Sequence, residues 1–232
     1  MTAPRSQKTI GLTLAIFGAL LLTPDTLFMR LSQLDGFNML LWRGGLSGLA
    51  YFMIWLWMRG PRDLSNIWTR NFAIIVACQT GNAALFSLAI ALAPVIVVLI
   101  GVATVPIFAA LLSRLLLGEA LSMRTLITAA MVFLGLFISV LGSDDGHLML
   151  DLTTLIGAGL GLGVAFSLAM NFTIIRKDTD VPFVLAIAVG AIAAAGLAAV
   201  FATTLAWPAL PQMAAIALTG IFILPLSFVT LS

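Results

Sequence analysis

The sequence predicts an all-α integral membrane protein, a polytopic helix bundle of about eight transmembrane helices. Of its 232 residues, 62% are hydrophobic and only 9% are charged, whereas a soluble domain carries about 25% charged residues because its surface faces water. The apolar runs are apolar on every side, which argues against a transmembrane barrel, whose strands alternate apolar and polar residues. A helix satisfies its own backbone hydrogen bonds in hydrocarbon, so helices are expected throughout.

The two longest charge-free runs set the number of helices. Residues 71–113 and 181–232 contain no charged side chain, and as single helices they would be about 65 and 78 Å long, at least twice the hydrocarbon thickness. Each therefore folds back once, the first at Ala93-Pro94 and the second near Trp207-Pro208. In chain order the predicted helices are 10–31, 38–58, 71–92, 95–117, 125–142, 152–175, 182–205 and 212–231.

Positive charge alternates between the connections of these helices. The N-terminus and every second connection carry nine of the eleven Lys and Arg residues, whereas the opposite connections carry only Arg30. The remaining one, Arg43, lies inside the second helix. The positive-inside rule then predicts a multi-pass protein of the inner (plasma) membrane with a cytoplasmic N-terminus. The long first apolar stretch lacks a small-residue cleavage site, so we expect an uncleaved first helix rather than a signal peptide.

Two segments of the chain resemble each other at an offset of 146 residues. The aligned pairs are Asp25 with Asn171, Arg30 with Arg176, Phe37 with Phe183, and Gly44 with Gly190. Any two apolar hairpins resemble each other to some degree, but five predicted helices separate these copies. An odd number inverts the second copy, and inverted repeats are typical of secondary transporters.

This repeat predicts two domains, a first five-helix repeat over residues 1–145 and a partial second repeat of three helices over residues 146–232. The same offset places the counterparts of Pro94, Pro106 and Glu119 beyond Ser232. We therefore expect an inverted five-helix repeat whose second copy is incomplete.

The segment from Ala91 to Glu119 has a distinctive pattern. Pro94 stands at a helix start, Pro106 near the middle of the membrane, and Leu117-Gly118-Glu119 follows Ser113-Arg114 at the cytoplasmic end. Proline lacks a backbone donor, so Pro106 predicts a kink or gating point in the fourth helix, and Pro24 predicts one in the first. Arg114 and Glu119 are interpreted as helix-end anchors, because charges near helix ends reach the aqueous boundary at little cost.

This pattern resembles the EamA-type transporters of the drug/metabolite transporter superfamily. The resemblance implies a ten-helix carrier of two inverted five-helix repeats, with a central cavity lined mainly by helices 1, 3, 4, 6, 8 and 9. It also implies secondary active transport of amino acids, related metabolites or drugs, in the export direction, by alternating access between the repeats. The sequence departs from the family pattern because it ends after the eighth predicted helix.

Five polar side chains within the predicted helices form the candidate substrate-binding set: Asp25, Arg43, Gln79, Asn82 and Asn171. A charge near the bilayer centre costs about 2.5–3.5 kcal/mol on insertion scales, which makes such residues functional candidates. Asp25 and Arg43 lie on consecutive helices at similar depth, about 9 Å below the outer interface. Two roles stay open for them. In the first role, Arg43 receives an anionic group such as a carboxylate, and Asp25 is its partner or a proton-linked switch. In the second, Arg43 and Asp25 form a permanent structural ion pair.

The three amides, Gln79, Asn82 and Asn171, are expected to bridge helices by hydrogen bonds, with cavity lining as their second role. Glycine pairs four residues apart predict close helix packing. These pairs are Gly44/Gly48, Gly157/Gly161 and Gly159/Gly163.

Other site chemistries find little support in the sequence. The acidic loop with Asp144, Asp145 and His147 lacks the ligand spacing of a closed metal site, so neither a metal nor a cofactor is expected. The chain has no phosphate-binding loop, so transport would run on a proton or ion gradient. With one histidine outside the predicted helices and no nucleophile–base pair, we do not expect an enzyme.

The expected partners are the lipid bilayer and a small-molecule substrate, and a homo-oligomer is compatible with the sequence. A net charge of +2 gives no reason to expect a nucleic-acid partner, and the single Cys78 excludes an internal disulfide. The alternative function is that of a non-transporting membrane module, or a truncated fragment, that packs with another subunit.

Overall fold

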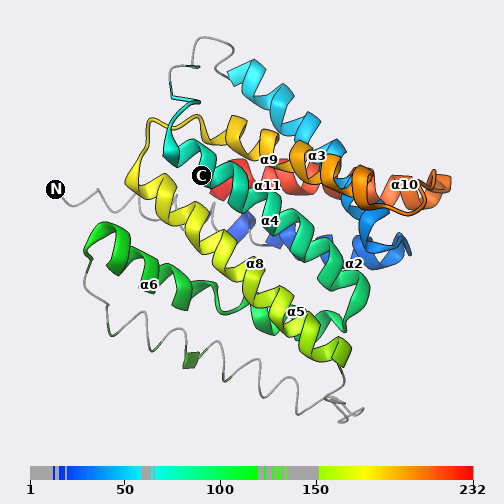
Figure 1. The fold of residues 1–232 in the computed structure, drawn as a ribbon, viewed down its shortest axis with the longest axis horizontal. Coiled ribbons are helices and arrows are strands. Elements are labelled where there is room, and N and C mark those ends of the chain that lie inside the picture. The colour runs from blue at the N-terminus through cyan, green and yellow to red at the C-terminus, as the bar shows by residue number, and fades with distance from the viewer. Residues whose placement is uncertain are drawn as a thin grey trace.

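The computed structural model describes residues 13, 16–18, 20–58, 64, 66–119, 123, 127, 130, 131, 134 and 152–231. Every regular element within these residues is a helix, which confirms the predicted class (Figure 1). Six of the described helical stretches are long and apolar enough to cross a membrane: Gly36–Met58, Arg70–Leu92, Val95–Leu117, Leu152–Lys177, Phe183–Phe201 and Leu210–Ser227. The predicted helices 10–31 and 125–142 fall partly or largely outside the described residues.

The first part of the chain contains α2 (Asp25–Leu31), α3 (Gly36–Met58), α4 (Arg70–Leu92), α5 (Val95–Val102) and α6 (Val105–Leu117). The remainder contains α8 (Leu152–Lys177), α9 (Phe183–Phe201), α10 (Leu210–Ala217), the π-helix η2 (Leu218–Ile223) and α11 (Leu224–Leu231). One predicted boundary is wrong by four residues, since α9 ends at Phe201 rather than at residue 205. Ala202 adopts an extended backbone there, and the chain leaves the helix ahead of Pro208.

Breaks in the helices lie close to the two prolines that the sequence singles out. A turn at Thr23-Pro24 precedes α2, and a second turn at Ala103-Thr104 separates α5 from α6. Pro106 is the second residue of α6 and has no N–H to continue the helical ladder from α5. At the break, the carbonyl of Gly101 accepts both the hydroxyl of Thr104 at 2.7 Å and the amide of Thr104 at 3.1 Å.

The central helices pack in a chain of neighbours. Helix α9 contacts both α3 and α4, and α8 contacts α4, α5 and α6 (Figure 1). Helices α3 and α9 run antiparallel, because Gly44 lies against Ala191 and Ala195 whereas Gly48 lies against Ala188 and Ile192. The small residues allow the two backbones to approach closely, as the glycine spacing predicts.

Two of the three predicted glycine pairs are confirmed as packing positions. A Cβ on Gly48 would lie 2.6 Å from the Ile192 side chain, and one on Gly161 would lie 2.7 Å from the carbonyl oxygen of Val98 in α5. The pairing of Gly159 with Gly163 is wrong as a shared surface. Gly163 lies against Leu85, but a Cβ on Gly159 would meet no described atom within 4 Å. Gly159 therefore lies outside the surface of α8 that packs on Leu85.

The last described helical stretch widens into η2 just before Pro225. Proline cannot donate to the preceding turn, and a π-turn is one way in which a helix accommodates this loss. Helix η2 packs on α3, since a Cβ on Gly220 would lie 3.3 Å from both the carbonyl oxygen of Arg43 and the amide nitrogen of Ser47. The wide turn is therefore placed directly on the backbone that carries Arg43.

Hydrogen bonds between connections show which of them share an end of the bundle. At one end, Asn66 and Asn71 bond to Asp180 and Asp178 in the α8–α9 connection, and Arg176 bonds to Glu119 after α6. We call this the basic end, because it holds Arg70, Arg114, Arg176 and Lys177.

At the opposite end, Arg30 donates to the carbonyl of Ala93. Asn38 donates to the carbonyl of Thr204 at 3.0 Å, and the indole of Trp42 donates to that of Ala206 at 3.1 Å. The connections after α2, α4 and α9 thus meet at one end and those after α3, α6 and α8 meet at the other. This is the alternation that the sequence predicts.

The Leu117-Gly118-Glu119 motif ends α6 and ties it to α8. Gly118 has φ of 68°, a left-handed conformation that glycine adopts without strain and that commonly terminates helices. The carboxylate of Glu119 then reaches Arg176 at 2.7 Å, with both side chains about half exposed. Exposed pairs contribute at most about 1 kcal/mol, so this contact adds an inter-helix tie to the end-anchoring role expected of Glu119.

Asp35 in the α2–α3 connection caps the start of α3. Its Oδ1 accepts hydrogen bonds from the amides of Phe37 at 3.0 Å and Asn38 at 3.1 Å. Partial burial acts to raise the pKa of Asp35, but the hydrogen bonds from Asn38 and Phe37 together lower the pKa below its ordinary value. The cap is therefore present at neutral pH and is lost only when acid protonates the carboxylate.

Candidate functional site

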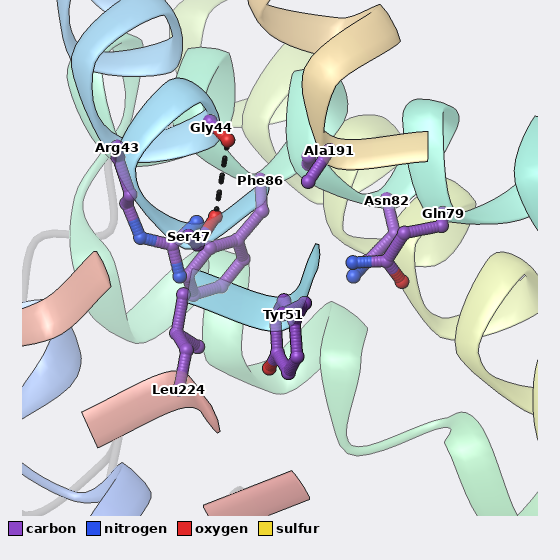
Figure 2. A pocket seen from close by; sticks show the side chains of 10 residues that line it. Arg43, Gly44, Ser47, Tyr51, Gln79, Asn82, Phe86, Ala191 and Leu224 are labelled. Atoms are coloured by element: carbon purple, nitrogen blue, oxygen red, sulfur yellow. Dashed lines mark hydrogen bonds between the residues drawn. The ribbon is translucent and has the colours of Figure 1, made fainter. Parts of the chain in front are cut away.

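A small pocket lies among α3, α4, α9 and α11. Its volume is about 40 Å³, and it is lined by Arg43, Gly44, Ser47, Tyr51, Gln79, Asn82, Ala83, Phe86, Ala191 and Leu224 (Figure 2). That volume holds only a few water molecules. A metabolite could enter only after the surrounding helices had moved apart.

Arg43 and Asp25 form a buried ion pair at the edge of this pocket. Nη2 of Arg43 donates to Oδ2 of Asp25 at 2.8 Å, and the two side chains are 8% and 6% exposed. The two residues lie on consecutive helices that a short connection joins, and the ion pair is a direct contact between them. The guanidinium also lies 5.7 Å from the ring centroid of Phe86, within the range of a cation–π contact.

Each partner of the ion pair keeps one polar atom unbonded. Among the described residues, Oδ1 of Asp25 and Nε of Arg43 have no hydrogen-bond partner. A buried polar atom without a partner costs about 1–3 kcal/mol. The pair is therefore joined by a single hydrogen bond and retains capacity for a further polar group.

Gln79 and Asn82 line the side of the pocket away from Arg43 (Figure 2). Outside the pocket, Nδ2 of Asn171 on α8 donates to Oε1 of Gln79 at 3.4 Å. Asn171 is buried and lies outside the pocket lining. The helix-bridging role expected of Gln79 and Asn171 is thus present, and Asn82 takes the cavity-lining position instead.

Seven of the ten lining residues were not among the sequence-predicted site residues, and three of these, Ser47, Tyr51 and Phe86, carry a polar or aromatic side chain. A signal for them exists, because Ser47 and Tyr51 follow Arg43 by four and eight positions and Phe86 follows Asn82 by four. Residues at this spacing share one face of a helix. The sequence alone does not distinguish such a face from ordinary core packing.

The two prolines differ in their distance from the pocket. Pro24 directly precedes Asp25, so the break before α2 sets the position of the carboxylate. Pro106 lies in α6, which packs on α8 and contributes no residue to the pocket lining. The acidic loop at residues 143–147 lies outside the described residues.

A family model described as the EamA-like transporter family matches residues 9–141, more than half of the chain, and includes the whole segment from Pro94 to Glu119. The chain belongs to the EamA-like transporter family. This EamA-like protein is therefore a multi-pass membrane transporter of the drug/metabolite type.

A search of solved structures gives a match titled only "Crystal structure of protein". It has a TM-score of 0.72 and 20% sequence identity, over 99% of the EamA-like chain and 78% of the matched chain. At this identity the match shows that the fold is shared. No curated protein matches the chain.

Proposed function

We propose that this EamA-like protein carries a small metabolite with an anionic group, such as a carboxylate, across the inner membrane in the export direction. The observation that supports this most strongly is Arg43, a buried cation on the pocket whose Nε has no partner among the described residues. The amino acids, related metabolites and drugs associated with the family include many compounds with such a group.

The remaining pocket chemistry supports an anion over a cation. Because Oε1 of Gln79 accepts from Asn171, its Nε2 donor is left for a ligand. Asn82 adds a second amide, and Phe86 offers an apolar face. No carboxylate is among the described residues that line the pocket, so a cationic ligand would find no counter-ion on its walls.

Alternating access is the mechanism that we assign to this carrier. Contacts at the basic end, such as Asn71 with Asp178, and at the opposite end, such as Asn38 with Thr204, would open in turn as the predicted repeats rock along the α3–α9 seam. The breaks near Pro24 and Pro106 are the candidate hinges. The basic end would face the cytoplasm, since Lys and Arg favour that side.

The test is transport by purified protein in lipid vesicles, with radiolabelled lactate, alanine and choline as an anion, a zwitterion and a cation. We expect Arg43→Ala to lower transport of the preferred probe about ten- to hundredfold, the factor that corresponds to a charged hydrogen bond. Membrane insertion should be unaffected, and Arg43→Lys should recover part of the activity because it keeps the charge.

Arg114→Ala is the matched control, because Arg114 is exposed on α6 and away from the pocket. It should transport normally. Unchanged transport by Arg43→Ala, or a preference for choline, would contradict the proposal. Transport of none of the three probes by the unmodified protein would favour the non-transporting module.

A further inference from the structure

Within the part of the chain that the structure describes, few ionisable groups lie on the helices around the ion pair. Helix α2 contacts α4, α10 and η2, and α3 additionally contacts α9 and α11. Of these elements, α9, α10, η2 and α11 contain no ionisable side chain, and α4 contains only Arg70 at its first residue and Cys78. On α2 and α3 themselves the other ionisable residues are Arg30, which donates to the carbonyl of Ala93, and Tyr51, whose phenol is neutral at physiological pH.

The pair is neutral as a unit when Asp25 is ionised, and an arriving anion changes this balance. A carboxylate on Arg43 would place two negative charges beside one positive charge in a buried site. Burying an uncompensated charge is costly, and such groups neutralise instead. Arginine does not lose its proton in proteins, so Arg43 cannot adjust to the change.

Among the described residues beside the pocket, Asp25 is the group that can restore neutrality. Its Oδ1 has no hydrogen-bond partner among the described residues, and its Oδ2 is held only by Nη2 of Arg43. A ligand carboxylate that takes over the guanidinium leaves Asp25 buried without its counter-ion. An isolated buried carboxylate favours its protonated form.

We infer that Asp25 takes up one proton when a monoanion binds Arg43, so that one anion and one proton cross the membrane together. This inference rests on the proposed function and names its coupling ion. In the exchange, Asp25 releases Nη2 of Arg43 and binds a proton from water, while the ligand carboxylate accepts hydrogen bonds from the guanidinium. The complex has the same net charge as the empty site, and transport is electroneutral. Export then requires an outward anion gradient that exceeds the inward proton gradient.

The test uses the intact chain in vesicles with radiolabelled lactate, and vesicles with Arg43→Ala supply the background of passive permeation. With the outside one pH unit more acidic, the initial rate of lactate uptake above this background should rise, and lactate should approach about tenfold accumulation inside, the equilibrium ratio for one proton per anion. A membrane potential set with potassium and valinomycin should leave this ratio unchanged.

Asp25→Asn imitates the protonated carboxyl group and removes the titration. Lactate transport by this variant should no longer respond to the pH gradient and should follow the membrane potential instead. Glu119→Gln is the matched control, because it removes an exposed carboxylate at the basic end, and it should stay proton-coupled.

The possible results separate the two proposals. Lactate transport by the unmodified protein that follows voltage and ignores the pH gradient overturns proton coupling but leaves the anion carrier intact, even if Asp25→Asn fails to fold. Proton coupling that survives Asp25→Asn also overturns the inference. Transport of alanine without lactate overturns it too, because a zwitterion needs no proton. Transport of none of the probes removes both proposals.

Discussion

Two polar contacts differ in charge, although each contains one member of an aligned pair of residues in the predicted repeat. Asp25 and Asn171 align at the 146-residue offset. Asp25 is joined to Arg43 by a charged hydrogen bond of 2.8 Å, whereas Asn171 is joined to Gln79 by a neutral one of 3.4 Å. Both contacts lie beside the same pocket, because Arg43 and Gln79 line it from different sides.

The difference separates a structural contact from a candidate ligand site. Neutral hydrogen bonds between membrane helices contribute about 0.6 kcal/mol on average, and they bury no charge. A buried ion pair is often no more stabilising than apolar side chains of the same size. The charged contact is therefore poorly explained by stability, and the uncharged contact is well explained by it.

The largest effect that we expect is from Asp25→Ala. The change leaves Arg43 buried without a counter-ion, and removing one partner of a buried pair costs about 3–5 kcal/mol. The free energy of unfolding in detergent micelles is the measurement. Asp25→Ala combined with Arg43→Met should recover much of the loss, and a single-variant loss below about 1 kcal/mol would mean that Arg43 does not depend on Asp25.

An intermediate effect is expected from the aligned glycines Gly44 and Gly190. A Cβ on Gly190 would lie 2.7 Å from Cβ of Gln79 and 2.9 Å from the carbonyl oxygen of Val76. A Cβ on Gly44 would have one such close contact, at 3.0 Å from the carbonyl oxygen of Ala191, and its next nearest atoms would be 3.5 Å away. Gly190→Ala should therefore cost about 1–3 kcal/mol of unfolding free energy, and Gly44→Ala less.

Gly196→Ala is the matched control for both glycines, because its Cβ would meet no described atom within 4 Å. It should be near neutral. An equal loss for Gly44→Ala and Gly190→Ala would remove the asymmetry between the two sides of the pocket.

The smallest effect is expected from Asn171→Ala. It removes one long neutral hydrogen bond, so the loss of unfolding free energy should be about 0.6 kcal/mol. The free energy of unfolding in detergent micelles is again the measurement, and transport in vesicles is a second one. A transport defect as large as that of Arg43→Ala would make Asn171 part of the ligand site and end the distinction between the two contacts.

The sequence predicts more of the charged contact than of the neutral one. Asp25 and Arg43 stand at similar distances from a short connection, so their depth follows from residue numbers and helix rise. Asn171 and Gln79 are 92 positions apart, and only the packing of α8 on α4 brings them together. The same holds for Leu224, which α11 adds to the pocket.

The sequence by itself determined the all-α membrane class, the positions of six described membrane-length helices and the alternation of their connections between two ends. Hydrocarbon imposes these features through span length and charge, which are local properties of the chain. Tertiary structure alone decided how each helix is rotated about its axis and therefore which polar side chains share a pocket. That rotation depends on contacts such as Gly44 with Ala191 and Gly190 with Gln79, which join residues far apart in the sequence, and local composition does not specify which partner each small residue meets.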